Sequence, residues 1–86
     1  NGTEVIYAWR RALMEKNKPT SIILSRQKIN QVATPLGADV ACGAYVIRPA
    51  NSTRVRATII ATGAEVPLAI AVAEKLGNTV QVVSMP

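Results

Sequence analysis

Residues 56–84 have the sequence RATIIATGAEVPLAIAVAEKLGNTVQVVS, in which three runs of different character follow one another. The first run, 56–62, and the last, 79–84, are rich in Val, Ile and Thr, which favour strands. The run between them, 65–76, is rich in Ala and Leu, which favour a helix, and a glycine stands close to each of its ends. A strand, a helix and a second strand in this order predict a βαβ unit with parallel strands.

The predicted helix at 65–76 is apolar around nearly its whole circumference. A helix that covers one face of a sheet needs only an apolar stripe, so we expect this helix to have a second packing partner. We place Ala64 at its N-cap and Pro67 in its first turn, where a missing N–H costs little. Gly77 then follows the helix as its left-handed cap.

The N-terminal part of the chain predicts a further helix and a further strand. Residues 3–16 have apolar residues at helical spacing, with Thr3 as the N-cap. Trp9 lies on the apolar face of this helix, so we expect it in the core. Residues 20–25, TSIILS, contain three apolar residues in a row, which is typical of a central parallel strand buried on both faces.

Residues 26–42 show no sustained periodicity, and so long a stretch indicates a connection between two units. We therefore expect an α/β fold built from pieces of two three-layer domains with parallel or mixed sheets. Residues 1–28 would end the first domain and residues 29–42 would form the linker. Residues 43–86 would open the second domain, with a strand at 44–47 before the βαβ unit. Both ends of the chain look cut, so we expect a piece of a longer polypeptide.

The composition excludes several classes of protein. The chain has 86 residues, of which 49% are apolar and 17% charged, so disorder is not expected. No apolar run approaches the roughly 18 residues of a membrane span, so we expect no membrane contact. The net charge of +5 is spread along the chain without interleaved aromatic residues, so nucleic acid is not an expected partner. An anionic small molecule or an acidic neighbouring domain fits this charge better.

The residue counts also limit the chemistry that the chain can perform. Histidine is absent, and no two of the five carboxylates have a spacing typical of catalysis or metal binding. We therefore predict no complete catalytic site. The single cysteine, Cys42, excludes an intrachain disulfide and favours a reducing compartment, for which we take the cytoplasm.

Two further features each have two interpretations. Cys42 is either a reactive thiol or a small residue of the linker. The turn Thr62-Gly63-Ala64-Glu65 is either a phosphate cradle or a tight connection between strand and helix, and Glu65 would repel an anion.

The residue with the clearest functional potential is Arg26, directly after the predicted strand at 20–25. In open α/β sheets, ligands bind beyond the carboxyl ends of the strands. The planar guanidinium has donors that match a phosphate, which supports a binding role. The alternative is that Arg26 pairs with a carboxylate of a neighbouring element.

Four short motifs occur here in the order and spacing of transketolases, and the similarity covers essentially the whole chain. They are Leu24-Ser25-Arg26-Gln27, Gly43-Ala44-Tyr45-Val46, Ile60-Ala61-Thr62-Gly63-Ala64-Glu65-Val66 and Val82-Val83-Ser84-Met85-Pro86. The chain resembles the stretch that joins the pyrimidine-binding domain of this family to its C-terminal domain. It departs from the family's usual pattern at Ala64, where Ser is frequent, and at Lys28-Ile29-Asn30, where Asn-Leu-Pro is frequent.

The resemblance implies a cytoplasmic, homodimeric transferase of the pentose phosphate pathway. Such an enzyme moves a two-carbon ketol unit between sugar phosphates, using thiamin diphosphate and a divalent cation, Mg²⁺ or Ca²⁺. In the family, the arginine of the Ser-Arg-Gln motif binds the substrate phosphate, which here is Arg26. The resemblance places the catalytic, cofactor-binding and metal-binding residues outside this chain, so we expect the fragment alone to be inactive.

A different class of function is a small stand-alone α/β binding or interaction module without enzymatic activity. That hypothesis predicts a complete hydrophobic core within the 86 residues.

Overall fold

The computed structural model describes residues 1–35 and 38–86. Leu36 and Gly37, which belong to the predicted linker, lie outside the described residues. The described elements are α1 (Gly2–Met14), the 3-10 turn η1 (Val40–Cys42), β1 (Tyr45–Arg48), β2 (Ala57–Ala61), the 3-10 turn η2 (Gly63–Glu65), α2 (Val66–Leu76) and β3 (Val80–Ser84).

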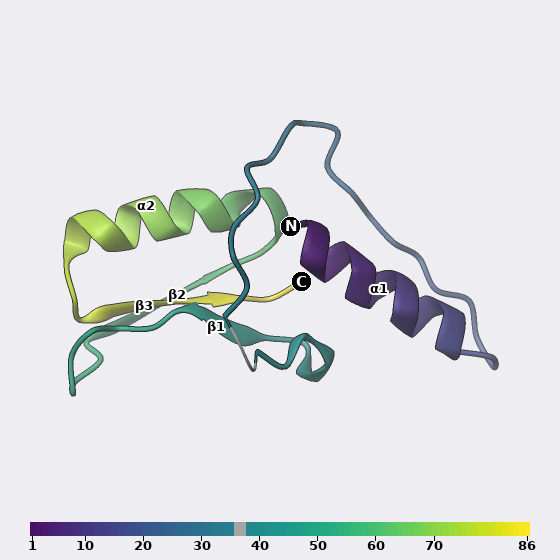
Figure 1. Cartoon of the computed structure of the whole chain (residues 1–86), viewed down its shortest axis with the longest axis horizontal. Helices are drawn as coiled ribbons and strands as arrows, with labels where there is room; N and C mark the ends of the chain where they lie inside the picture. The colour runs from purple at the N-terminus through teal and green to yellow at the C-terminus, as the bar shows by residue number, and fades with distance from the viewer. Residues whose placement is uncertain (36–37) are drawn as a thin grey trace.

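The three strands form one mixed sheet in the order β1-β3-β2 (Figure 1). β2 and β3 are parallel and are joined through α2, which confirms the predicted βαβ unit and the α/β class. β1 is antiparallel to β3. In this register Ser84 pairs with Ala61 on one side and with Tyr45 on the other, so these three residues share the carboxyl edge of the parallel pair.

The core lies between α2 and the sheet. α2 covers one face of the sheet (Figure 1), because its small buried residues allow close approach to β3. The fully buried Val82 lies at the centre of the sheet. The buried core residues are Val40, Tyr45, Ile47, Val66, Ala69, Ala73, Val80 and Val82.

The start and end of α2 differ from two of the sequence predictions. Pro67 lies in the first turn, as predicted. Ala64, however, lies inside η2, and the N-cap of α2 is Glu65, so the prediction of Ala64 as the N-cap was wrong. Gly63 has φ +54° and allows the chain to turn from β2 into η2. Gly77 also has a positive φ, +106°, but its ψ of −165° lies outside the left-handed helical region.

Helix α1 begins one residue earlier than predicted. Asn1 caps it, and Thr3 does not, because the Asn1 side chain accepts a hydrogen bond from the backbone N–H of Glu4. Trp9 is 55% exposed, so its predicted place in the core was wrong. The physical reason is that α1 lies beside the end of the sheet (Figure 1), where Ile6 and Leu13 of the same helix are also more than half exposed.

Residues 15–35, which we call the connecting segment, contain no helix or strand. The predicted buried strand at 20–25 was wrong, and Ile23 is 94% exposed. A strand needs a neighbour for its backbone N–H and C=O groups, and none of the three described strands pairs with these residues. The connecting segment instead returns along α1 and arches back to the sheet (Figure 1).

Candidate functional site

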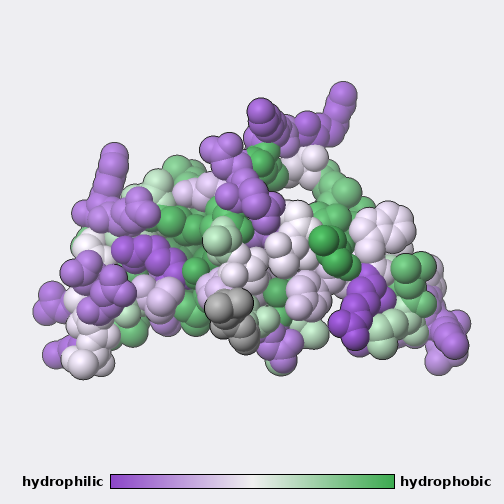
Figure 2. Space-filling view, in the orientation of Figure 1, coloured by the Kyte–Doolittle hydropathy of each residue, from purple (hydrophilic) through white to green (hydrophobic). Residues whose placement is uncertain are grey.

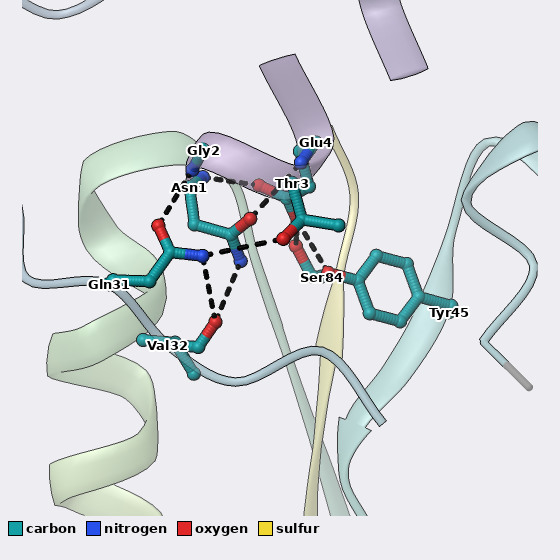
Figure 3. Close-up of polar contacts among 8 residues, drawn as sticks. All are labelled: Asn1, Gly2, Thr3, Glu4, Gln31, Val32, Tyr45 and Ser84. Atoms are coloured by element: carbon teal, nitrogen blue, oxygen red, sulfur yellow. Dashed lines mark hydrogen bonds and ion pairs between the residues drawn. The ribbon is translucent and has the colours of Figure 1, made fainter. Parts of the chain in front are cut away.

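The first turn of α1 meets the carboxyl edge of the sheet through one buried side chain, Glu4 (Figure 3). Glu4 Oε1 accepts hydrogen bonds from Tyr45 Oη at 2.8 Å and from Ser84 Oγ. Its second oxygen, Oε2, lies 2.7 Å from the backbone nitrogen of Asn1, which completes a capping box. We call Asn1, Glu4, Tyr45 and Ser84 the Glu4 cluster.

The Glu4 cluster holds its carboxylate in the ionised form. Burial raises the pKa of Glu4. The hydrogen bonds from the N-terminal ammonium group of Asn1, from Ser84 and from Tyr45, together with the charge of that ammonium group, outweigh burial, and the net pKa is lowered. The pKa of Tyr45 is raised, first by burial and then by its hydrogen bond to Glu4. Tyr45 therefore stays a hydrogen-bond donor at neutral pH.

The same turn of α1 also holds the connecting segment (Figure 3). The backbone N–H of Gly2 donates to Gln31 Oε1 at 2.9 Å, and Gln31 Nε2 donates to Thr3 Oγ1 at 3.4 Å. Asn1 Nδ2 donates to the backbone oxygen of Val32 at 3.4 Å. The first turn of α1 is thus bonded to the connecting segment, to β1 and to β3.

A cavity of about 580 Å³ lies between α1, the connecting segment and the carboxyl edge of the sheet. Its walls include Glu4, Val5 and Arg11 of α1, residues 20–25, and Gly63 at the turn after β2. Figure 2 shows the corresponding hollow between the arch of the connecting segment and the body of the molecule. The cavity is large enough for a small molecule, and its wall carries the positive charge of Arg11 and the negative charge of Glu4.

Arg26 is exposed and does not line this cavity, although its neighbours Ser25 and Gln27 do. Within residues 1–35 and 38–86, the Arg26 side chain forms no ion pair or hydrogen bond. The alternative role of Arg26, pairing with a carboxylate, therefore has no partner in the described part of the chain. The structure does not bring Arg26 into the Glu4 cluster.

The two ambiguous features of the sequence have simple structures. Residues 62–65 form a tight strand-to-helix turn, with the acidic Glu65 at the start of α2. Cys42 is an exposed residue of the linker, and its Sγ donates to Asp39 Oδ2 at 3.0 Å. That hydrogen bond and the charge of Asp39 raise the pKa of the Cys42 thiol. A raised pKa disfavours the thiolate, so Cys42 is not an activated nucleophile.

The sequence predictions missed the Glu4 cluster. Glu4 has the usual features of a first-turn charge that favours the helix dipole, and that role is local. The signal that could have revealed it is Ser84, a polar residue at the alternate position after Val80 and Val82 on a buried strand face. A polar side chain on such a face needs a hydrogen-bond partner.

Among the described residues, no group of three or more His, Cys, Asp or Glu side chains is close enough together to hold a metal ion. None of the described helices has the length and hydropathy needed to cross a membrane.

The mixed sheet, its covering helix and the motifs at its edge define a piece of an α/β protein. Residues 43–86, about half the chain, match the family model of the transketolase-like TK C-terminal domain. The plasmid transketolase of Cupriavidus necator is 42% identical over 91 residues, covering 100% of this chain and 13% of that protein. The transketolase of Geobacillus stearothermophilus is 39% identical over 92 residues, covering 100% of this chain and 14% of that protein.

A solved structure is similar over nearly the whole chain. The crystal structure of transketolase from Campylobacter jejuni superimposes with a TM-score of 0.84 at 39% sequence identity, covering 99% of this chain and 13% of that chain. The chain belongs to the transketolase family. It spans about 13% of the length of the relatives that it matches.

Proposed function

We propose that this chain is part of an enzyme that transfers a two-carbon ketol unit between sugar phosphates in the pentose phosphate pathway. The observation that carries the proposal is the match to transketolases at about 40% identity over the whole chain, which includes the Leu24-Ser25-Arg26-Gln27 motif. The parent protein would be a cytoplasmic homodimer and the fragment alone inactive.

The proposed role of Arg26 is to bind the phosphate of the sugar substrate and so to orient the sugar. Its guanidinium is exposed and has no partner among the described residues, so it is free to bind an anion. Two parallel hydrogen bonds to phosphate oxygens would fix both the position and the direction of the substrate.

Thiamin diphosphate and a divalent cation are implied by the family, but the described residues do not fit either group. Histidine is absent, and no cluster of metal-binding side chains occurs in the described residues. We therefore assign no residue of this chain to the cofactor or the cation and derive no step through them.

The domain organisation that we propose is unchanged from the sequence prediction. Residues 1–28 end the pyrimidine-binding domain, residues 29–42 form the linker, and residues 43–86 open the C-terminal domain. The family model that begins at residue 43 supports the second boundary. The alternative of a stand-alone module finds less support, because large apolar side chains are exposed on both described helices, among them Trp9, Leu13, Leu68 and Leu76.

The role of Arg26 is tested by Arg26→Ala in the complete protein. With a phosphorylated ketose donor, kcat/KM is expected to fall about ten- to hundredfold, because a charge-assisted hydrogen bond is lost. With hydroxypyruvate as the donor, and an unphosphorylated acceptor in both assays, it should change little. Arg54→Ala, which removes another exposed arginine, is the matched control. Equal losses with both donors would reject the phosphate role.

A further inference from the structure

Helix α1 is attached to the sheet by polar contacts rather than by apolar packing. Among the described residues, the hydrophobic core contains no residue of α1. The buried residue of this helix is Glu4, which is 6% exposed. Hydrogen bonds to a carboxylate are directional, whereas apolar surfaces can slide over one another, so this attachment fixes a position as well as a contact.

The place of attachment is where a ligand would bind in an open α/β sheet. Ser84 ends β3, and Tyr45, its partner in the register, begins β1. Ligands of such sheets bind beyond the carboxyl ends of the strands. Here the carboxylate of Glu4 occupies that edge and is bound by two hydroxyl groups of the sheet.

The same turn of helix holds the segment that carries Arg26, in addition to Val32 of that segment, which packs against the core. Gln31, five positions after Arg26, is bonded to Gly2 and to Thr3, and Val32 is bonded to Asn1. Any displacement of the first turn of α1 along the sheet therefore moves the attached part of the connecting segment with it.

We propose that Glu4 is a positioning residue, whose carboxylate fixes the connecting segment, and with it Arg26, relative to residues 43–86. Glu4 does not contact the substrate; it acts through Tyr45 and Ser84 on one side and through the capped first turn on the other (Figure 3). The inference rests on the phosphate-binding role proposed for Arg26, and it gives the C-terminal part of the chain an influence on sugar-phosphate affinity.

The test uses Tyr45→Phe and Glu4→Gln in the complete protein. Tyr45→Phe deletes one donor and keeps the ring, whereas Glu4→Gln removes the charge and one acceptor. Glu74→Gln makes the same chemical change on an exposed surface of α2 and is the control. We measure the hydrogen exchange of residues 2–5, whose amides bond Gln31 and Asn1, together with KM and kcat for phosphorylated and unphosphorylated donors.

In Tyr45→Phe and Glu4→Gln, we expect exchange at residues 2–5 to accelerate roughly tenfold, because a charge-assisted hydrogen bond that holds this turn on the sheet is lost. KM for the phosphorylated donor should rise by a similar factor, while kcat and the KM for the unphosphorylated donor stay unchanged. In the control Glu74→Gln, the exchange, KM and kcat should all stay unchanged. The variant that combines Glu4→Gln with Tyr45→Phe should show nearly the same exchange rate and KM as Glu4→Gln alone, because both changes break the same contact. If Glu4→Gln does not fold, the same measurements on Tyr45→Phe and Ser84→Ala test the inference, because each removes one donor to Glu4.

Unchanged exchange at residues 2–5 would overturn the inference. So would faster exchange with an unchanged KM, if Arg26→Ala itself raises KM for the phosphorylated donor. If Arg26→Ala has no effect on that KM, the proposed role of Arg26 fails. Faster exchange would then still support the positioning by Glu4.

Discussion

Residues 43–86 and residues 1–35 are stabilised by different interactions. In residues 43–86, Val80 and Val82 of the central strand pack against Ala69 and Ala73 of α2. In residues 1–35, large apolar side chains such as Ile23 are exposed. Apart from Val32, which packs against the core, this region is joined to the sheet by hydrogen bonds from the polar first turn of α1. The two regions therefore respond to different changes: the first to loss of volume and the second to loss of hydrogen bonds.

The two regions also differ in whether their apolar segments pack against another element. α2 and β3 complete each other's apolar surfaces within the described residues. The apolar face of α1 and the run at 20–25 have no such partner there, although their patterns are as strong. An apolar pattern indicates which side chains of a segment need to be buried. Those side chains become buried only where another element is present to cover them.

The largest effect on this comparison is expected from Val82→Ala. Val82 is 0% exposed, and truncating it removes about two buried methylene equivalents and leaves a cavity, a loss of about 2 kcal/mol in stability. Hydrogen exchange should show reduced protection in β2, β3 and α2. The amides of α1 should keep their protection, because α1 contributes nothing to this core among the described residues. Equal loss of protection in α1 would show that the two regions form one cooperative unit.

How far the sequence predicts this molecule follows the same division. The βαβ unit was predicted correctly because its signals are local: β-branched runs, an alanine-rich helix and glycines at the turns. The run at 20–25 was assigned to a strand on equally good local signals, and it failed because pairing depends on a neighbouring strand. The Arg26 assignment rests on motif similarity and stays a prediction.

The Glu4 cluster could not be predicted from the sequence by local rules. Glu4 and Ser84 are separated by 80 positions, and Glu4 and Tyr45 by 41. No periodicity or cap signal reports a contact over such distances. Only the burial of Ser84 in the strand pattern indicates that some partner must exist, without indicating which one.

A smaller effect on stability is expected from pH, and it should act on the attachment of α1 to β1 and β3. Because the pKa of Glu4 is lowered on folding, its contribution to stability is fully present above the ordinary glutamate pKa of 4.5 and is lost as the pH falls through the lowered value. The loss should be smaller than that in Val82→Ala, because a protonated Glu4 still accepts a hydrogen bond. Thermal unfolding between pH 7 and pH 3 measures it.

Glu4→Gln serves as the reference in that experiment, because it cannot ionise. The difference in melting temperature between the unsubstituted protein and Glu4→Gln should shrink as the pH falls below 4.5. A difference that is constant with pH would show that the charge of Glu4 contributes nothing to the attachment of α1.

The smallest effects concern the two helix caps, which differ between the regions. Asn1 caps α1 with its side chain, which accepts from the backbone N–H of Glu4 at 3.1 Å, so Asn1→Ala should lower stability by about 1 kcal/mol.

α2 has no side-chain cap, and Ala64 lies within η2 rather than at the N-cap. Ala64→Ser should therefore change stability by less than about 0.5 kcal/mol, as substitutions outside such features do. Urea unfolding of both variants of the complete protein tests this. A stabilisation of about 1 kcal/mol by Ala64→Ser would mean that the new hydroxyl accepts a free N–H of α2, and that the start of this helix is as open to side-chain capping as that of α1.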